Sequence, residues 1–527
     1  MHIEKNCDLG VRLHKSFARL HEKEYQMHQP LARDGGSWPG DWEGRALLGL
    51  VRLAGVLGEK PKYLDEITGA YFSDLAGRPY YGSPVEPGVC DEQQLSGHSW
   101  LLLAMCRLFA YNGDKRALEE IKALVSALLL PCSGMYARYP KNPADRIVEG
   151  GASGSLTGSV INGWKTSSDV GCAFIMFDGA TCCYPILASH DPALAQALLP
   201  LLDEMAEAFL TLDFVGVSAQ THATLAGLRG LLRYISLREK PELLAPAKAI
   251  FALYQSQGMT ENFANFNWFG RPFWTEPCAY LDSIADSFLL FDLTGDASYI
   301  DFVYQVYYNA VGYGQRENGG FGCDVCAGPA GDFLSPTEGG YEAIWCCTMR
   351  GGDVLPLLAE NAVREEAGET RVLFYTDGET ETLSMRTNNF WNGRAQLVCK
   401  PGFRGPLFLF APSFAKAFSL SVNGAARAAA PENGFLRVDG LKGGDEVVLE
   451  MTFLLEKVPA ATAPGKVKFM FGPYVLGVKT GEAVAIGCAA PQNGAFLADG
   501  KLRLGPINDS ISRTKDDLLS LNTQILF

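Results

Sequence analysis

The sequence lacks the long apolar segments that mark membrane-spanning and secreted proteins. It contains no run of 18 uninterrupted apolar residues, so we expect no membrane span. Its opening stretch, MHIEKNCDLGVRLHKSF, has no apolar core of a signal peptide, and we therefore expect a cytoplasmic protein. The 14 cysteines in 527 residues are too sparse for a disulfide scaffold, which predicts reduced thiols.

Positive charge is scarce as well. The chain has 45 Lys and Arg residues against 59 Asp and Glu residues, which gives a net charge of −14. Such a surface repels phosphate backbones and anionic membranes, so neither nucleic acid nor a membrane is an expected partner. Apolar residues make up 47% of the chain, which excludes intrinsic disorder, and the length indicates more than one domain.

The first two-thirds of the chain repeats one pattern, in which an apolar helix ends in a short polar turn and a second helix follows. Each first helix is apolar nearly all round, which is typical of an inner, buried helix. A sixth pair is expected near 345–365. The pattern predicts a closed (α/α)6 barrel over 1–365, and an irregular helical bundle is the alternative. The turns lie at 59–61, 113–114, 189–191, 239–241 and 295–296.

After 365 the pattern changes to short alternating segments separated by turn residues. Asn423-Gly424 between two such segments is a strong hairpin signal. The spacing predicts a β-sandwich over 366–505, which includes two strands in VKFMFGPYVLGVK. The polar residues 506–527 are expected to form a tail over the surface. The other expected strands are 371–375, 381–386, 395–400, 407–410, 418–422 and 446–453.

Reactive side chains are densest between 261 and 347. Thiolates and carboxylates bind zinc, and adjacent cysteines cannot easily form a disulfide with each other. The pattern therefore indicates a zinc site, either reactive or a structural knuckle made from the four cysteines after 320. Buried thiols without a metal are the alternative. The residues concerned are Glu261, Glu276, Cys278, Cys323, Cys326, Cys346 and Cys347.

Two of the seven histidines, His98 and His222, lie at the openings of expected inner helices. These openings gather at one mouth of a barrel, so both rings are candidates for a shared pocket. A capping role is the alternative for each, and Glu92 is a candidate hydrogen-bond partner of His98. Nearby aromatic residues suit either sugar stacking or core packing. They are Phe263, Phe266, Trp268, Phe269, Phe273, Trp274 and Trp345.

In this order the motifs resemble the β-L-arabinofuranosidases of glycoside hydrolase family 127 and the related family 146. Glu-x-Cys at 276–278 is followed by a Gly-Asp turn, by Tyr308-Asn309 and by the Cys346-Cys347 pair. The likeness extends over nearly the whole chain. It also includes the segment from Glu92 to His98, the helix start at His222, and the strand-like stretches PSFAKAFSLSVNG, GFLRVDGLKGGDEVVLEM and FGPYVLGVK.

The resemblance implies an (α/α)6 barrel followed by a β-sandwich, and a zinc-dependent retaining glycosidase. It assigns Cys346 as the nucleophile, which bound zinc would keep ionised, and Glu261 as the acid/base. Thr348 stands where the family usually has proline, and a family tyrosine has no clear counterpart, which leaves the sugar open. The implied zinc ligands are Glu276, Cys278, Cys346 and Cys347, and the implied sugar contacts are His98, His222 and Trp268.

The leading hypothesis is hydrolysis of a β-L-arabinofuranoside or a related sugar. The expected partners are a small-molecule or oligosaccharide substrate and, for assembly, a second copy of the chain as a homodimer. One alternative is a non-catalytic carbohydrate-binding or structural zinc protein. Another is a sugar isomerase or epimerase, because barrels of this kind host other sugar chemistry.

Overall fold

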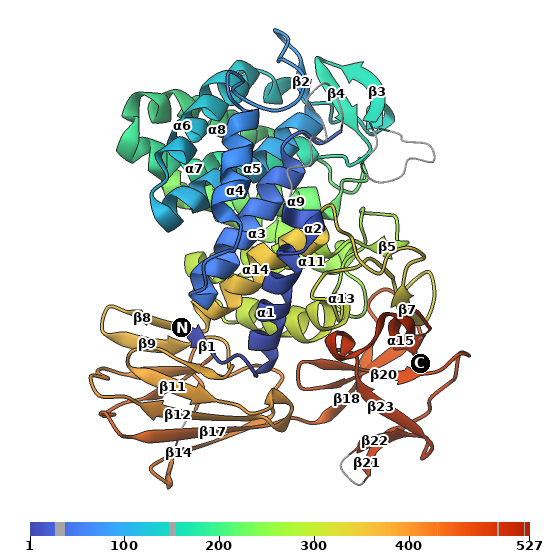
Figure 1. Cartoon of the computed structure of the whole chain (residues 1–527). Helices are drawn as coiled ribbons and strands as arrows, with labels where there is room; N and C mark the ends of the chain where they lie inside the picture. The colour runs from blue at the N-terminus through green and yellow to red at the C-terminus, as the bar shows by residue number, and fades with distance from the viewer. Residues whose placement is uncertain (27–36, 147–153, 155, 429, 493–494, 521) are drawn as a thin grey trace.

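The computed structural model describes the whole chain except residues 27–36, 147–153, 155, 429, 493–494 and 521. In this part of the chain, six inner helices form a closed ring in which each contacts the next and the last contacts the first. The predicted (α/α)6 barrel is therefore confirmed (Figure 1). The inner helices are α3 (Asp41–Leu57), α5 (Glu92–Asn112), α7 (Ile175–His190), α9 (Thr221–Arg238), α11 (Pro277–Thr294) and α14 (Cys347–Asn361).

Outer helices alternate with the inner ones along the chain. The sixth pair differs from the predicted order, because its outer helix, α1, comes from the N-terminus and packs between α14 and α3. The chain thereby closes the ring with its first and last barrel helices. The outer helices are α1 (Asp8–Leu20), α4 (Leu64–Asp74), α6 (Lys115–Leu124), α8 (Pro192–Leu210), α10 (Leu244–Leu253) and α12 (Ser298–Val306).

The predicted Gly-Asp turns end one helix and begin the next. Gly113 ends α5 in the left-handed conformation, with φ of 71°, and the Asp114 side chain caps α6 through the backbone N–H of Arg116. Helix α7 belongs to the segment Cys172–His190, which is long and apolar enough to cross a membrane and is 67% buried inside the fold. Its packing against α5, α8 and α9 accounts for that apolar surface.

A β-sandwich follows the barrel and lies below it in Figure 1. The predicted Asn423-Gly424 hairpin joins β14 to β15, and both turn residues have positive φ. One sheet has the order β1 (His2–Ile3), β10 (Gly378–Glu379), β11 (Leu383–Arg386), β12 (Arg394–Cys399), β17 (Glu446–Thr452), β14 (Ala417–Val422), β15 (Ala425–Arg427). The other has the order β16 (Phe435–Val438), β13 (Leu407–Phe410), β9 (Glu369–Val372), β8 (Val363–Glu366).

The chain from 455 onward departs from the predicted single sandwich. It forms a separate sheet that also takes in short strands from the barrel segment. Its connected order is β21 (Ala489–Gln492), β22 (Ala495–Ala498), β23 (Leu502–Pro506), β20 (Tyr474–Lys479), β24 (Thr523–Gln524), β7 (Phe333–Pro336), β6 (Asp324–Val325), β5 (Trp274–Thr275). The hairpin β18 (Leu455–Pro459) and β19 (Val467–Phe471) joins it at β20.

The C-terminal residues are part of this sheet and do not form the surface tail that we predicted. Strand β24 pairs with β20 on one side and β7 on the other, and Ile525 and Leu526 are fully buried. The cause is the apolar pair Ile525-Leu526, which belongs to the hydrophobic core beside this sheet. Helix α15 (Lys515–Ser520) precedes it. Because β5 ends at Thr275, this sheet also positions the residue that follows, Glu276.

Candidate metal centre and active site

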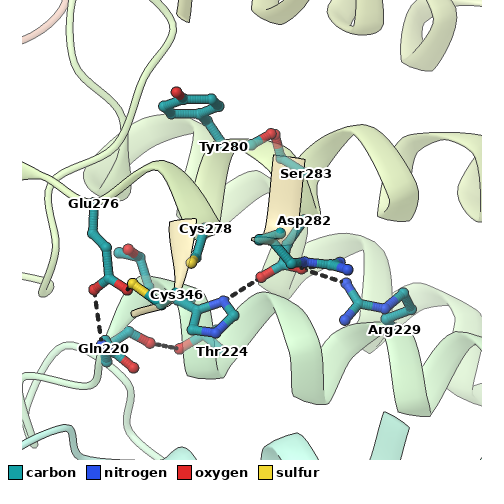
Figure 2. A network of polar contacts seen from close by, with 12 residues as sticks. Gln220, Thr224, Arg229, Glu276, Cys278, Tyr280, Asp282, Ser283 and Cys346 are labelled. Carbon is teal, nitrogen blue, oxygen red and sulfur yellow. Dashed lines mark hydrogen bonds and ion pairs between the residues drawn. The ribbon is translucent and has the colours of Figure 1, made fainter. Parts of the chain in front are cut away.

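Four side chains converge where two neighbouring inner helices begin. Glu276 is the N-cap of α11 and Cys278 lies in its first turn, while Cys346 is the N-cap of α14 and Cys347 is its first residue. Their ligand atoms all lie within 4.8 Å of one another. Figure 2 shows Glu276, Cys278 and Cys346 turned toward one another. Two segments 70 residues apart are thus joined because α11 and α14 are adjacent in the ring.

The spacing of these donors fits a tetrahedral metal. Two thiolates bound at about 2.3 Å to one tetrahedral zinc are about 3.8 Å apart. The Sγ atoms of Cys278 and Cys347 are 3.7 Å apart, and those of Cys346 and Cys347 are 3.2 Å apart. Cys346 Sγ lies 3.5 Å from Glu276 Oε1. Three sulfurs and one carboxylate oxygen therefore form a compact set that suits zinc or a similar thiophilic cation.

The electrostatics of the cluster also favour a bound cation. Burial raises the pKa of Glu276 well above its usual value, and the charge of Cys278 adds to the effect. Burial also opposes ionisation of Cys278, but hydrogen bonds from Cys346 and Cys347, with His222 and Arg45 nearby, bring its pKa well below the usual value. The hydrogen bond to Cys278 raises the pKa of Cys346. The protein alone therefore favours one thiolate here, and a divalent cation would stabilise the others.

The four donors differ in access to solvent. Cys278 and Cys347 are fully buried, whereas Cys346 is 9% exposed and Glu276 is 7% exposed. Cys346 and Glu276 therefore form the outward side of the cluster. Trp345 directly precedes Cys346 in the chain and is 59% exposed.

Two supporting residues escaped the sequence analysis. Gln220 Nε2 donates to Glu276 Oε2 at 3.3 Å, as Figure 2 shows. Arg45 Nη1 lies 3.7 Å from Cys278 Sγ and donates to it. Gln220 is the N-cap of α9 and Arg45 lies in the first turns of α3. The inner-helix openings that singled out the histidines would have indicated these two residues as well.

His222 lies beside the cluster but both of its ring nitrogens contact protein groups. Its Nε2 accepts a hydrogen bond from Arg45 Nη2 at 3.2 Å, and its Nδ1 bonds to Asp282. Since an arginine only donates, the proton of the neutral ring is on Nδ1. The ring is 2% exposed. This geometry makes His222 a support of the cluster, whereas the predicted contact with sugar stays a prediction.

His98 is bonded to the backbone on both sides of its ring. Nδ1 contacts the carbonyl oxygen of Gln94 at 2.7 Å, and Nε2 accepts from the backbone N–H of Tyr81 at 3.0 Å. The ring is fully buried, and burial lowers its pKa to about 4. These contacts occupy both ring nitrogens and disfavour the predicted sugar contact, and His98 does not cap the helix, because α5 begins at Glu92 with Asp91 as its N-cap. Glu92 is not its partner, because its carboxylate binds Arg146 at 2.9 Å.

The predicted aromatic residues separate into two groups. Trp268 is 4% exposed and packs edge-to-face on Trp274 at 5.8 Å, so most of its surface belongs to the core. It forms a β-bridge with Gln220, which places its backbone next to the support of Glu276. Phe273 is 62% exposed, as open as Trp345. These two rings have faces open to solvent on which a sugar could stack, whereas the Trp268 ring does not.

Glu261 is held by the C-terminal sheet. Its Oε1 accepts from the backbone N–H of Thr462 at 2.6 Å and from the Thr462 hydroxyl at 2.7 Å. Lys468 forms an ion pair with Oε2 at 3.0 Å. Burial raises the pKa of Glu261, but Lys468 and Thr462 outweigh it, and the net shift is downward. This environment disfavours the predicted role, since a general acid must carry a proton.

A second carboxyl, Asp169, which the sequence analysis did not single out, lies close enough to Glu276 for its charge to act on that residue. It is 3% exposed, follows β4 (Trp164–Ser167), and its charge raises the pKa of Glu276. Its Oδ2 accepts from the backbone N–H of Gly154 at 2.9 Å. Asp169 is therefore a second candidate for proton transfer at this site.

The two other cysteines of the region do not complete a zinc knuckle. The Cys326 thiol is buried 3.2 Å from the Thr275 hydroxyl, and burial raises its pKa to about 12. Cys323 is half-buried and contributes to raising the pKa of Cys347, but it lies outside the four-donor set. Among the described residues, the group that could hold a metal is the Glu276, Cys278, Cys346 and Cys347 set.

Comparison with known proteins places this fold. A GH127 β-arabinofuranosidase superposes with a TM-score of 0.67 at 14% identity, over 98% of this chain and 91% of that chain. A structure described as a glycoside hydrolase gives 0.67 at 14% identity, over 100% and 96%. A GH127 β-L-arabinofuranosidase from Geobacillus stearothermophilus T6 gives 0.65 at 12% identity, over 98% and 93%. Neither a family model nor a curated protein matches the sequence. The chain therefore has the fold of the GH127 β-L-arabinofuranosidases over nearly its whole length.

Proposed function

We propose that this protein is a zinc-dependent retaining glycoside hydrolase that acts on a β-L-arabinofuranoside or a related sugar. The observation that carries the proposal is the set of three sulfurs and one carboxylate oxygen at the starts of α11 and α14. This set occurs in a chain that shares its fold with GH127 β-L-arabinofuranosidases.

Cys346 is the nucleophile in this proposal because it is the cluster thiol with access to solvent. Its sulfur attacks the anomeric carbon and forms a covalent glycosyl-enzyme, which water then hydrolyses. Glu276, Cys278, Cys346 and Cys347 would hold the zinc. When bound, zinc supplies positive charge that favours the thiolate over the thiol. Cys347 is buried behind Cys346 and serves as a ligand alone.

Proton transfer to the leaving group needs a carboxyl on the outward side of the cluster. The resemblance assigns Glu261, and the contacts of Glu261 with Lys468 and Thr462 keep that carboxyl ionised. Asp169 is the carboxyl whose charge acts on Glu276. We give the acid/base role to one of these two, and the proximity of Asp169 to Glu276 favours Asp169.

A second function has a specific observation in its favour. If Glu261 is the family's acid/base and is permanently engaged by Lys468, the site would bind sugar without cleaving it. The protein would then be a carbohydrate-binding zinc protein. Turnover separates this reading from the hydrolase.

The decisive experiment is a panel of aryl glycosides that includes β-L-arabinofuranoside, assayed with and without a chelator. We expect release of the aryl group from at least one pentofuranoside, loss of that activity with the chelator, and recovery with zinc. Sugar binding without turnover across the panel, in zinc-loaded protein, would favour the binding protein. Turnover that a chelator leaves intact in verified metal-free protein would overturn the metal-dependent mechanism.

A further inference from the structure

The buried residue Arg45 lies directly behind the candidate metal centre, in contact with Cys278. Arg45 is 4% exposed and its guanidinium contacts four groups. Nε donates to Asp41 Oδ2 at 2.8 Å, Nη1 donates to Cys278 Sγ at 3.7 Å, and Nη2 donates to His222 Nε2 at 3.2 Å. Its carbon centre lies 4.0 Å from the centroid of the Trp100 ring. Every edge of the fork therefore has a partner, and its position is fixed.

The contact with Cys278 has an electrostatic meaning. Three thiolates and one carboxylate carry four negative charges, which a divalent cation only half neutralises. A buried excess of negative charge is costly unless a positive group lies beside it. Arg45 supplies such a group on the inner side of the cluster, next to the fully buried Cys278.

The position of Arg45 is in turn held by a chain of buried groups. His222, which accepts from Arg45, bonds to Asp282 through its other nitrogen. Asp282 also accepts from Arg229 Nη1 at 2.7 Å and from Arg350 Nε at 2.9 Å. Burial raises the pKa of Asp282, but Arg350 and Arg229 outweigh it, so the carboxyl stays ionised. Figure 2 shows Asp282 and Arg229 on the side of Cys278 away from Glu276.

We propose that Arg45 is a positioning residue that holds the Cys278 thiolate and lowers the electron-donating strength of the metal's sulfur ligands, with His222 and Asp282 orienting its guanidinium. The inference rests on the proposed metal-dependent function. A hydrogen-bond donor to a ligand sulfur withdraws electron density from it, and partners of metal ligands of this kind affect metal affinity strongly. Arg45 thereby tunes the metal and, through it, the reactivity of Cys346.

The test uses the full chain loaded with Co²⁺ in place of zinc, because the thiolate-to-cobalt absorption band reports the electron density on sulfur. In Arg45→Gln we expect this band to move to longer wavelength and zinc affinity to fall about 10- to 100-fold. Arg45→Lys keeps the positive charge, so its cobalt band position and its zinc affinity should both lie between those of Arg45→Gln and wild type. His222→Ala should move the band in the same direction by less, because Arg45 then loses one anchor.

The control is Arg12→Gln, which removes a buried arginine whose hydrogen-bond partners lie outside the cluster. Arg12 is 2% exposed and donates to Gln315 and to the backbone of Asn508. This variant should leave the cobalt band and the zinc affinity as in wild type. Should Arg45→Gln fail to fold, Arg45→Lys and His222→Ala are read in its place.

An unchanged band and unchanged zinc affinity in the folded Arg45 and His222 variants would overturn the inference and leave the proposed function standing. The same band shift in Arg12→Gln would also overturn it, since the shift would then report general destabilisation. Wild-type protein that binds neither zinc nor cobalt would instead refute the proposed function, and the inference with it. If His222 served only to contact sugar, His222→Ala would leave the cobalt band unchanged.

Discussion

Cys346 and Cys347 are neighbours in the chain with opposite environments: Cys346 is 9% exposed and caps α14, whereas Cys347 is fully buried as the first residue of that helix. Both should bind the metal, and only Cys346 can reach a sugar. We expect Cys346→Ser and Cys347→Ser both to lose metal affinity. In zinc-loaded wild-type protein, a reactive sugar analogue such as a haloacetamide derivative should label Cys346, which peptide mapping would identify. Selective labelling of Cys347, or full activity of Cys346→Ser, would contradict the assignment.

Metal content should follow the four-donor set. Purified protein should contain about one zinc per chain, because the donors fit one tetrahedral ion. Cys278→Ser should lower both zinc content and melting temperature, since metal binding is coupled to folding. Elemental analysis and calorimetry measure these two quantities. Cys326→Ser is the matched control, because Cys326 is a buried thiol that bonds to Thr275 outside the set. A metal-free wild type with an intact fold would refute the metal centre.

The acid/base can be identified from leaving groups. When the leaving group is poor, loss of the general acid slows cleavage by about 10²- to 10⁴-fold. When the leaving group is an activated phenol, the rate falls much less, because such a phenolate leaves without a proton. We expect this selective loss in Asp169→Asn. In Glu261→Gln we expect lower stability, because Lys468 loses its ion-pair partner, with little change in the leaving-group dependence. Cleavage rates across a series of substituted phenyl glycosides decide between Asp169 and Glu261. If the rate depended more steeply on the pKa of the leaving phenol in Glu261→Gln alone, the assignment drawn from the family resemblance would be restored.

His98 should make the fold sensitive to mild acid. Burial lowers its pKa to about 4, whereas an unfolded histidine titrates near 6.5, so the unfolded chain takes up the proton first as pH falls. The stability contribution is present above pH 6.5 and is lost as pH falls from 6.5 toward 4. Between pH 7 and pH 5 the free energy of unfolding should drop by about 2 kcal/mol through this residue. Urea unfolding of wild type and His98→Gln at both pH values measures it, and an equal drop in the two proteins would refute the effect.

The C-terminal residues should contribute to stability. Leu526 is fully buried under the sheet that contains β24, so Leu526→Ala should lower the free energy of unfolding by about 2–5 kcal/mol. Leu519→Ala is the control, because Leu519 is 44% exposed in α15. Chemical unfolding of both variants provides the comparison. Equal stability of the two would show that the end of the chain is not packed.

The local features of this protein follow from its order of amino acids. Helix pairs followed from apolar segments ended by Gly-Asp turns such as Gly113-Asp114, and the hairpin at Asn423-Gly424 followed from its need for positive φ. The Glu276, Cys278, Cys346 and Cys347 set was recognisable because these residue types bind zinc and match a family motif. The turns depend on residues within a few positions of one another, where local conformation decides the outcome. The metal set was recognised from residue type and order alone, although its two halves are 70 residues apart.

The neighbours of these features, by contrast, depend on how distant segments pack together in the folded chain. The pairing of α1 with the last barrel helix and the insertion of β24 between β20 and β7 join segments distant in the chain, and no local pattern specifies such partners. The same holds for roles within the site. His98 bonds to backbone atoms, Glu261 is held by Lys468, and Arg45 donates to Cys278. A side chain's protonation and reach depend on burial and on charges brought by other elements, and these exist only once the chain is folded.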